Sequence, residues 1–278
     1  MSKILVIAGM HRSGTSLITR WLNCCGLFVG DRLAGPEIGN TDGLFEDEDF
    51  QQLHKRFLRY RNCSPIGFEF TPFAPLDDSE KQQLQHIIER RQLAHHEWGW
   101  KDPITCLFLD AYRELVPAAH YIFIVRDFRS AVSSLVTREH KVDMKKFQGK
   151  KGLSRIKWKL FKRKKIKNPF QLYAEKFLKV WIHYHELIIE HVRLIPESHY
   201  VFVHHSQLIQ SDRKLLHQLT HRWKFSLHHF PFSQVYKQAM ISEVVPFEKN
   251  IRNKELLYKA EQIEKRFREM LFQIGPDA

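Results

Sequence analysis

Residues 3–25 read KILVIAGMHRSGTSLITRWLNCC, and this stretch decides the fold class. Its first part, Lys3–Ile7, is an apolar run rich in β-branched side chains, which predicts a buried strand. The loop Gly9–Gly14 follows, and Thr15–Cys25 has the pattern of a helix that ends near Gly26. A strand that passes through a glycine-rich loop into a helix turns backbone N–H groups toward a phosphate.

The rest of the chain alternates strands and helices in the same manner. Further strands are predicted at Trp98–Lys101, Tyr121–Val125 and Tyr200–Val203. Helices are predicted at Phe45–Tyr60, Ser79–His95, Ile104–Leu115, Arg129–Glu139, Phe170–Arg193, Asp212–Trp223 and Asn253–Phe272. This alternation predicts a three-layer α/β fold of the P-loop type, with a mostly parallel central sheet and helices on both faces. Because no repeat or linker interrupts it, we expect a single domain over residues 1–278.

Composition excludes several classes of protein. The 278 residues are 43% hydrophobic and 13% aromatic, which is too apolar for a disordered chain. No apolar run approaches the ~18 residues of a membrane span. Four cysteines are too few for a disulfide scaffold, and Met1–Arg12 lacks the pattern of a signal peptide. We therefore expect a globular protein of the cytoplasm.

Positive charge is concentrated in one segment. The chain has 44 Lys and Arg against 31 Asp and Glu, a net charge of +13. Residues 141–167, the basic insert, hold thirteen Lys and Arg and one acid, Asp143, so the rest of the chain is nearly neutral. Four interpretations stay open: a solvated surface loop, a lid that gathers an anionic substrate, a helix on an anionic membrane surface, or a nucleic-acid patch. A nucleic-acid partner is the least favoured of these.

The loop Gly9–Gly14 has the spacing of the nucleotide phosphate loop, G-x-x-x-x-G-K-[ST], with one substitution. Thr15 stands where such loops carry the lysine that reaches the β- and γ-phosphates of a nucleoside triphosphate. Arg12 lies inside the loop, and Ser16 takes the place of the hydroxyl that holds magnesium. The later strands end in no plain aspartate that could also bind magnesium, so hydrolysis of a nucleoside triphosphate is disfavoured.

A second pattern follows the strand Tyr121–Val125. Arg126 comes directly after this strand, at the edge of a parallel sheet where ligands bind. Ser134 lies eight residues further on, about two turns into the next predicted helix. A guanidinium and a hydroxyl that share one anion suit a phosphate monoester.

Together, the lysine-free phosphate loop and the strand–Arg–x7–Ser pattern resemble the sulfotransferases that use 3′-phosphoadenosine 5′-phosphosulfate (PAPS). In that family the first motif holds the 5′-phosphosulfate and the second holds the 3′-phosphate. The resemblance therefore implies that PAPS is bound by Arg12, Ser13, Gly14, Thr15, Ser16, Arg126 and Ser134. Two more segments resemble bacterial and carbohydrate-type members: Trp98–Pro103, with a Lys-Asp-Pro element, and the late strand and turn Tyr200–Leu208. The resemblance spans most of residues 1–230.

The same resemblance assigns two cations to the transferred group, with Arg12 and Lys101 near the sulfate and the bridging oxygen. Such an in-line transfer depends mainly on positioning and on neutralisation of charge. No metal is expected, since His217 and His221, which lie at a helical spacing that can chelate one, have no identifiable third ligand. A simpler interpretation of Lys101 is a surface ion pair with Asp102.

A hydroxyl acceptor also needs a general base. Cytosolic members of the family carry a histidine two residues after the lysine, but this chain has Pro103 there. Bacterial relatives use a glutamate after the phosphate-loop helix, and Glu46 matches that place, with Glu48 and Glu37 as alternatives. A simpler interpretation is that the acidic residues around Glu46 only favour a helix N-terminus.

We therefore expect a PAPS-dependent sulfotransferase whose acceptor is a carbohydrate or glycoconjugate hydroxyl, by resemblance to bacterial members. The basic insert suggests an anionic glycan or glycolipid as acceptor, or a peripheral membrane contact through residues 141–167. Two alternatives belong to other classes. One is an NTP-dependent P-loop kinase, and the other is a non-enzymatic adaptor that keeps the fold and binds a membrane or nucleic acid through the insert.

Overall fold

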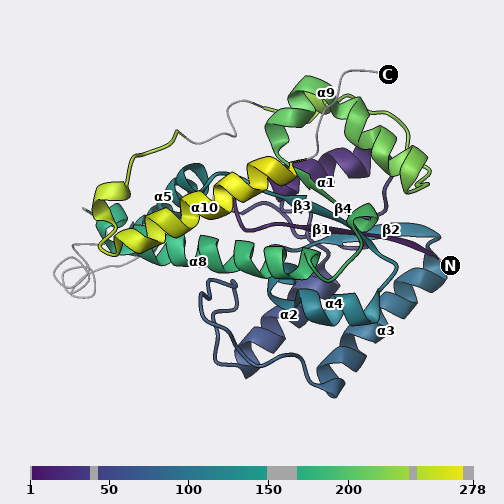
Figure 1. The fold of residues 1–278 in the computed structure, drawn as a ribbon. Helices are drawn as coiled ribbons and strands as arrows, with labels where there is room; N and C mark the ends of the chain where they lie inside the picture. Colours follow the sequence, from purple (N-terminus) through teal and green to yellow (C-terminus); the bar gives the residue numbers. More distant parts are fainter. Residues whose placement is uncertain (1, 38–42, 149–167, 238–242, 272–278) are drawn as a thin grey trace.

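Four parallel strands form the centre of the described structure (Figure 1). The computed structural model describes residues 2–37, 43–148, 168–237 and 243–271. Within these residues the strands are β1 (Lys3–Ala8), β2 (Glu97–Lys101), β3 (His120–Ile124) and β4 (Tyr200–Val203). Their order in the sheet is β2-β1-β3-β4, and each neighbouring pair is parallel. Parallel neighbours need crossover connections, which helices supply here.

Helices cover both faces of this sheet (Figure 1). On one face, α1 (Thr15–Cys24) and α9 (His205–His217) share a buried apolar cluster with Leu5 and Ile7 of β1. On the other face, Ile4 and Val6 pack in a cluster built by further helices. These are α2 (Glu48–Tyr60), α3 (Asp78–Ala94), α4 (Leu109–Leu115), α5 (Phe128–Gln148), α8 (Pro169–Val192) and α10 (Lys254–Met270). Successive strand side chains point to opposite faces, so the predicted three-layer α/β fold is confirmed.

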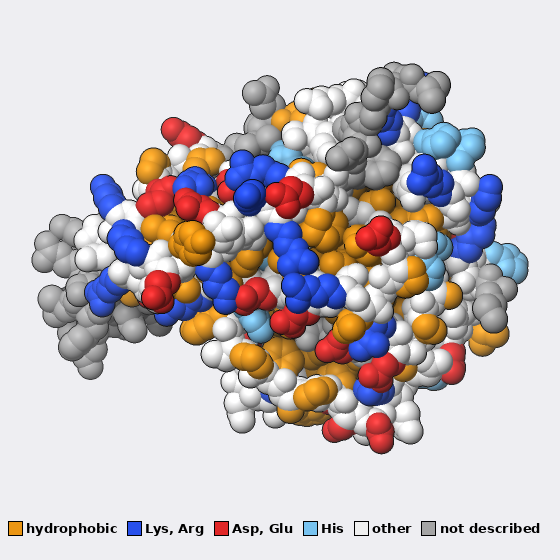
Figure 2. Space-filling view, viewed as in Figure 1, with side chains coloured by type: hydrophobic (Ala, Val, Ile, Leu, Met, Phe, Trp, Pro, Cys, Tyr) orange, Lys and Arg blue, Asp and Glu red, His pale blue; other side chains and the backbone are white. Residues whose placement is uncertain are grey.

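Acidic and basic side chains are interspersed on the face drawn in Figure 2. Lys259 of α10 pairs with Glu186 of α8 at 2.7 Å, and Arg129 of α5 pairs with Glu261 of α10 at 3.1 Å. Exposed pairs of this kind add little to stability. The mixed surface agrees with the nearly neutral charge of the chain outside the basic insert.

The helix expected at Phe45–Tyr60 begins later than predicted. Its first expected residue has a φ of 54°, in the left-handed region, and α2 begins at Glu48. The Asp47 carboxylate accepts a hydrogen bond from the backbone N–H of Asp49 at 2.9 Å and so caps the helix. Glu46 therefore lies in the segment before α2 and not on the helix.

Two other helices also differ from their predicted limits. The segment expected as one helix at Ile104–Leu115 begins as a 3₁₀ helix, Pro103–Phe108, before α4. The helix expected at Asp212–Trp223 begins at His205 as α9 and is broken at Ser211, whose φ of −157° is extended. The other predicted elements outside α5 lie within two residues of their observed limits.

α5 is longer than the predicted helix Arg129–Glu139, because it continues to Gln148. The first eight residues of the basic insert, 141–148, are therefore helical, and residues 149–167 lie outside the described residues. Across the described parts of the chain, no helix has the length and apolar character needed to cross a membrane.

Candidate active site

The phosphate loop lies at the carboxyl end of β1, where β1 passes into α1. A Cβ on Gly9 would lie 2.5 Å from the carbonyl oxygen of Ile124, so the loop can pass β3 only with glycine there. Gly14 has a φ of 95° and Arg12 a φ of 68°, both in the left-handed region. The first N–H groups of any α-helix have no acceptor within the helix, and no side-chain hydrogen bond caps those of α1.

The hydroxyl side chains of the loop differ in their surroundings. The buried Ser13 hydroxyl has no hydrogen-bond partner among the described residues. Thr15 is buried, with its methyl group against Gly9. The Ser16 hydroxyl accepts a hydrogen bond from the Lys101 ammonium at 3.3 Å. The hydroxyl groups of Ser13 and Ser16 therefore have surroundings suited to an additional polar partner.

The structure brings the two predicted motifs into direct contact. The Nε of Arg12 donates to the Ser134 hydroxyl at 2.9 Å, and the Nη1 of Arg126 donates to the carbonyl oxygen of Arg12 at 2.9 Å. Burial, followed by the charges of Arg126 and Arg138, lowers the pKa of Arg12 to about 10. The charges of two guanidinium groups thus reach a third, that of Arg12, and this makes the surroundings of Arg12 favourable for an anion.

Lys101 and Glu46 form a buried ion pair beside the loop. The Nζ of Lys101 lies 2.9 Å from Oε1 of Glu46, and the two side chains are only 1% and 8% exposed. The amide of Gln51 donates to the second carboxylate oxygen, Oε2. Burial raises the pKa of Glu46, while the Lys101 charge and the hydrogen bonds from Lys101 and Gln51 oppose the rise. The interpretation of Lys101 as a surface residue paired with Asp102 is therefore wrong.

The two alternative glutamates lie elsewhere. Glu48 is in the first turn of α2, 3.8 Å from the guanidinium of Arg32. Glu37 pairs with Arg138 of α5 at 2.9 Å. Of the three candidates, Glu46 is the one whose carboxylate contacts Lys101. The acidic residues that follow it do favour a helix N-terminus, as the simpler interpretation held, but Glu46 itself precedes that helix.

Asp102 belongs to a buried polar chain that the sequence did not reveal. Its Oδ2 lies 2.8 Å from Nδ1 of His54, and Nε2 of His54 lies 2.6 Å from the Tyr112 hydroxyl. Burial alone would raise the pKa of Asp102, but the hydrogen bond and charge of His54 lower it. The other oxygen, Oδ1, accepts from the N–H of Ile104 at 3.0 Å. Asp102 therefore fixes the backbone directly after Lys101.

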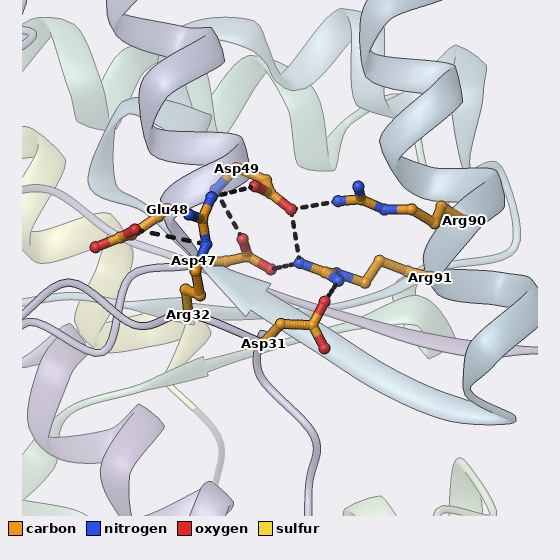
Figure 3. A network of polar contacts seen from close by, with 7 residues as sticks. All are labelled: Asp31, Arg32, Asp47, Glu48, Asp49, Arg90 and Arg91. Atoms are coloured by element: carbon orange, nitrogen blue, oxygen red, sulfur yellow. Dashed lines mark hydrogen bonds and ion pairs between the residues drawn. The ribbon is translucent and has the colours of Figure 1, made fainter.

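A second polar network holds the start of α2, as Figure 3 shows. Arg91 of α3 donates to Asp31 and, at 2.9 Å and 3.0 Å, to Asp47 and Asp49. Asp47 directly follows Glu46 and is 1% exposed. The network thus fixes the backbone next to Glu46 from the side of α3.

Two histidines at the loop were also missed, because no spacing in the sequence sets them apart from the other histidines. Burial lowers the pKa of His11 to about 4, and its Nε2 has no partner among the described residues. His205 lies against Gly14, at 3.8 Å from the place of a Cβ there, and burial lowers its pKa to about 4 as well. Both rings are therefore neutral near pH 7.

The described residues contain no group of three His, Cys, Asp or Glu side chains placed to hold a metal ion. His217 and His221, which the sequence singled out, have their rings stacked on each other with centroids 4.1 Å apart.

Fold and site together define an α/β protein of the P-loop type with a cluster of cationic side chains at the carboxyl end of its sheet. The model of the sulfotransferase family matches residues 5–228. The chain therefore belongs to the sulfotransferase family, a family of transferase enzymes, and the resemblance noted in the sequence is confirmed. No curated protein sequence matches the chain.

Two solved structures are similar in fold. The sulfotransferase domain from the curacin biosynthetic pathway has a TM-score of 0.51 and 14% identity, covering 98% of this chain and 99% of that one. The sulfotransferase STF9 from Mycobacterium avium has a TM-score of 0.55 and 12% identity, covering 96% of this chain and 76% of that one. At such identities the similarity supports the fold alone.

Proposed function

We propose that this protein transfers a sulfuryl group from PAPS to a hydroxyl group of a carbohydrate or glycoconjugate. One observation carries the proposal: the buried ammonium of Lys101 contacts both Ser16 of the phosphate loop and the carboxylate of Glu46. A cation, a loop hydroxyl and a carboxylate meet at one point. Sulfuryl transfer requires groups of these three kinds: a hydroxyl that binds the donor, a cation that neutralises the leaving phosphate, and a carboxylate that accepts the proton.

In this proposal PAPS lies across the carboxyl ends of β1 and β3. Ser13, Gly14, Thr15 and Ser16 bind the 5′-phosphosulfate through hydroxyl and N–H groups, and Arg126 with Ser134 binds the 3′-phosphate. The contacts of Arg12 with Ser134 and Arg126 support a continuous donor site. Burial is the main cause of the lowered pKa of Arg12, and the charges of Arg126 and Arg138 add to it; a negative charge between these arginines would oppose both effects.

The transfer itself is an in-line displacement at sulfur. The acceptor oxygen forms a bond to sulfur while the bond from sulfur to the bridging phosphate oxygen breaks. Lys101 and Arg12 neutralise the charge that develops on the leaving phosphate, and Glu46 takes the proton of the acceptor hydroxyl. The products are the sulfated acceptor and 3′,5′-adenosine bisphosphate, so PAPS is consumed as a co-substrate.

The acceptor class and the place of action are also part of the proposal. The carbohydrate or glycoconjugate acceptor comes from the resemblance to bacterial members, and the basic insert favours an anionic glycan or glycolipid. Four free cysteines, two of them adjacent and unbridged, suit the reducing cytoplasm. Peripheral contact with a membrane through residues 141–167 is compatible with this location.

The first experiment measures thermal stability with 3′,5′-adenosine bisphosphate and, separately, with ATP and magnesium. A ligand at ~100 times its Kd adds about 2.7 kcal/mol to the free energy of unfolding, which raises the Tm by several degrees for a chain of this size. We expect the bisphosphate to stabilise the protein and Arg126→Ala to abolish that effect.

Other outcomes decide between the classes. Stabilisation by ATP and magnesium alone would favour a kinase. Stabilisation by neither ligand would favour an adaptor without donor binding. If Arg126→Ala keeps the full shift, the bisphosphate binds outside the proposed donor site.

A further inference from the structure

A line of polar and basic side chains runs along one face of α5, starting at the donor site. Ser134, Arg138, Lys141 and Lys145 follow one another at intervals of four, three and four residues. Residues at such intervals lie above one another on one helix face. At about 1.5 Å per residue, the line from Ser134 to Lys145 is about 16 Å long. We call Arg138, Lys141 and Lys145 the α5 basic stripe.

The stripe leads from the interior to the surface. Ser134 is buried and bonded to Arg12, Arg138 has a side chain that is 22% exposed, and Lys141 and Lys145 are exposed. The inner end also acts electrostatically on the site: burial is the main reason that the pKa values of Arg12 and His11 are lowered, and the charge of Arg138 adds to both shifts. Its outer end is uncompensated, since neither lysine forms an ion pair within the described residues.

A carboxylate already lies on the stripe. Glu37 pairs with Arg138 at 2.9 Å, and its side chain is 47% exposed. It comes from the segment between α1 and α2, which also carries Glu46. The pair shows that Arg138 can hold a carboxylate here, and its exposure means that a competing anion can displace Glu37 at little cost.

We propose that the α5 basic stripe binds the anionic groups of an extended acidic oligosaccharide, which delivers a hydroxyl group to Lys101 and Glu46. The proposal rests on the proposed sulfotransferase function and narrows its acceptor to a chain with repeated carboxylate or sulfate groups. The cations of the stripe lie about one helical turn apart. A polymer with repeated negative charges can contact several of them at once, which a single small anion cannot do.

The α5 basic stripe lacks the side chains that binding of two other anionic partners, a membrane or a nucleic acid, would require. A helix that lies on a membrane needs large apolar side chains beside its basic residues, and none of the exposed large hydrophobic residues belongs to the described α5. Single-stranded nucleic acid needs aromatic side chains on which bases stack, and the stripe has none.

The test measures binding of a fluorescein-labelled hexamer of galacturonic acid by fluorescence anisotropy. The full chain is kept in 3′,5′-adenosine bisphosphate at low salt. We expect Lys145→Ala to weaken binding about threefold and the Lys141→Ala/Lys145→Ala variant about tenfold, as for exposed charge pairs. Lys146→Ala is the matched control, because Lys146 is also exposed but lies on another helix face. It should change binding by less than about 1.5-fold.

A further variant tests the role of Glu37. Glu37→Gln removes the carboxylate that competes for Arg138 and should strengthen binding of the acidic hexamer about twofold. Neutral maltohexaose should bind neither the wild type nor this variant.

Several results would overturn the proposal. The first is that Lys145→Ala and Lys146→Ala weaken binding of the acidic hexamer equally. The second is that maltohexaose binds as tightly as the acidic hexamer. The third is that the acidic hexamer does not bind, while labelled oligodeoxythymidine or phosphatidylserine vesicles do. Failure of the function itself looks different. If 3′,5′-adenosine bisphosphate does not stabilise the wild type, the donor assignment fails; if it does and the hexamer shows no stripe dependence, only the acceptor inference fails.

Discussion

At the scale of single residues, Glu46 is held from several sides. Lys101 contacts one carboxylate oxygen, Gln51 donates to the other, and the backbone carbonyl of Glu46 accepts from the N–H of Ala34 at 2.8 Å. The side chain is nevertheless almost entirely withdrawn from water. Its proton affinity therefore depends on a few named partners and not on solvent.

The amide of Gln51 provides a direct test of this dependence. Because a hydrogen bond to a carboxylate favours its charged form, Gln51→Leu should raise the pKa of Glu46 further above its ordinary value. The measurement is a carbon-13 NMR titration of the glutamate carboxyl groups, with Glu46→Gln to assign the signal. Gln52→Leu is the control, because Gln52 is exposed on α2. An unchanged titration in Gln51→Leu would show that this bond does not tune Glu46.

Arg12, Ser16, Arg126 and Ser134 could be predicted because they stand at recognisable spacings in two motifs, and Lys101 because its Lys-Asp-Pro element resembles the family. The other members of the polar chain of Asp102, which are His54 and Tyr112, have no such spacing. They come from α2 and α4, and His54 can bond both Asp102 and Tyr112 only because both helices pack on the same face of the sheet. No local pattern could have joined them.

At the scale of elements, the start of α2 decides where Glu46 lies. Arg91 is buried and bonded to three carboxylates, whereas its neighbour Arg90 has a side chain that is 53% exposed and, among the described residues, pairs with one carboxylate, that of Asp49 (Figure 3). The two arginines thus make a matched pair on α3, one inside the protein and one outside it.

Arg91→Ala should destabilise the protein strongly, because it leaves the buried Asp47 carboxylate without its cation. Breaking a buried ion pair costs about 3–5 kcal/mol, whereas loss of an exposed pair costs at most about 1 kcal/mol. Urea denaturation of Arg91→Ala, Arg91→Lys and Arg90→Ala measures the difference. We expect Arg91→Lys to restore only part of the loss, because an ammonium cannot reproduce the planar fork of guanidinium donors. Equal losses for Arg90→Ala and Arg91→Ala would contradict this account.

The strands and most helices could be predicted from apolar periodicity, but their limits could not. The acidic run at the start of α2 is compatible with a helix beginning at Phe45, and only the capping bond of Asp47 and the left-handed backbone of Phe45 place the start at Glu48. Likewise, the extension of α5 to Gln148 requires packing against α8, to which Tyr173 contributes a hydrogen bond to Asp143.

At the scale of the whole molecule, burial keeps many histidines neutral. Burial lowers the pKa to about 4 for at least five of them: His11, His120, His185, His191 and His205. Between pH 6.5 and 4 the unfolded chain therefore binds protons that the folded protein does not. Each such histidine contributes stability that is lost as the pH falls through this range.

We expect the free energy of unfolding, measured by urea denaturation, to fall by several kcal/mol between pH 7.5 and 5.5, with up to about 1.4 kcal/mol per pH unit from each histidine. His185 is fully buried, and its ring packs against Trp181 with centroids 4.0 Å apart. His185→Phe should therefore reduce the pH dependence of the free energy of unfolding by the contribution of one histidine. His86→Gln, at an exposed position, should leave it unchanged. A stability that is flat from pH 7.5 to 5.5 would refute the assignment.

By itself the sequence determined the class of fold, the phosphate loop, the Arg126–Ser134 pattern and the family, since all of these depend on spacing along one chain. Only the tertiary structure decided that Glu46 and not Glu48 or Glu37 contacts Lys101, that Asp102 pairs with His54, and that α5 continues far enough for its basic residues to form one line from Ser134. The physical reason is the same in each case. Contacts between distant segments arise from the packing of helices on the sheet, and a carboxylate has the same sequence signature whether that packing buries it against a lysine or leaves it in water.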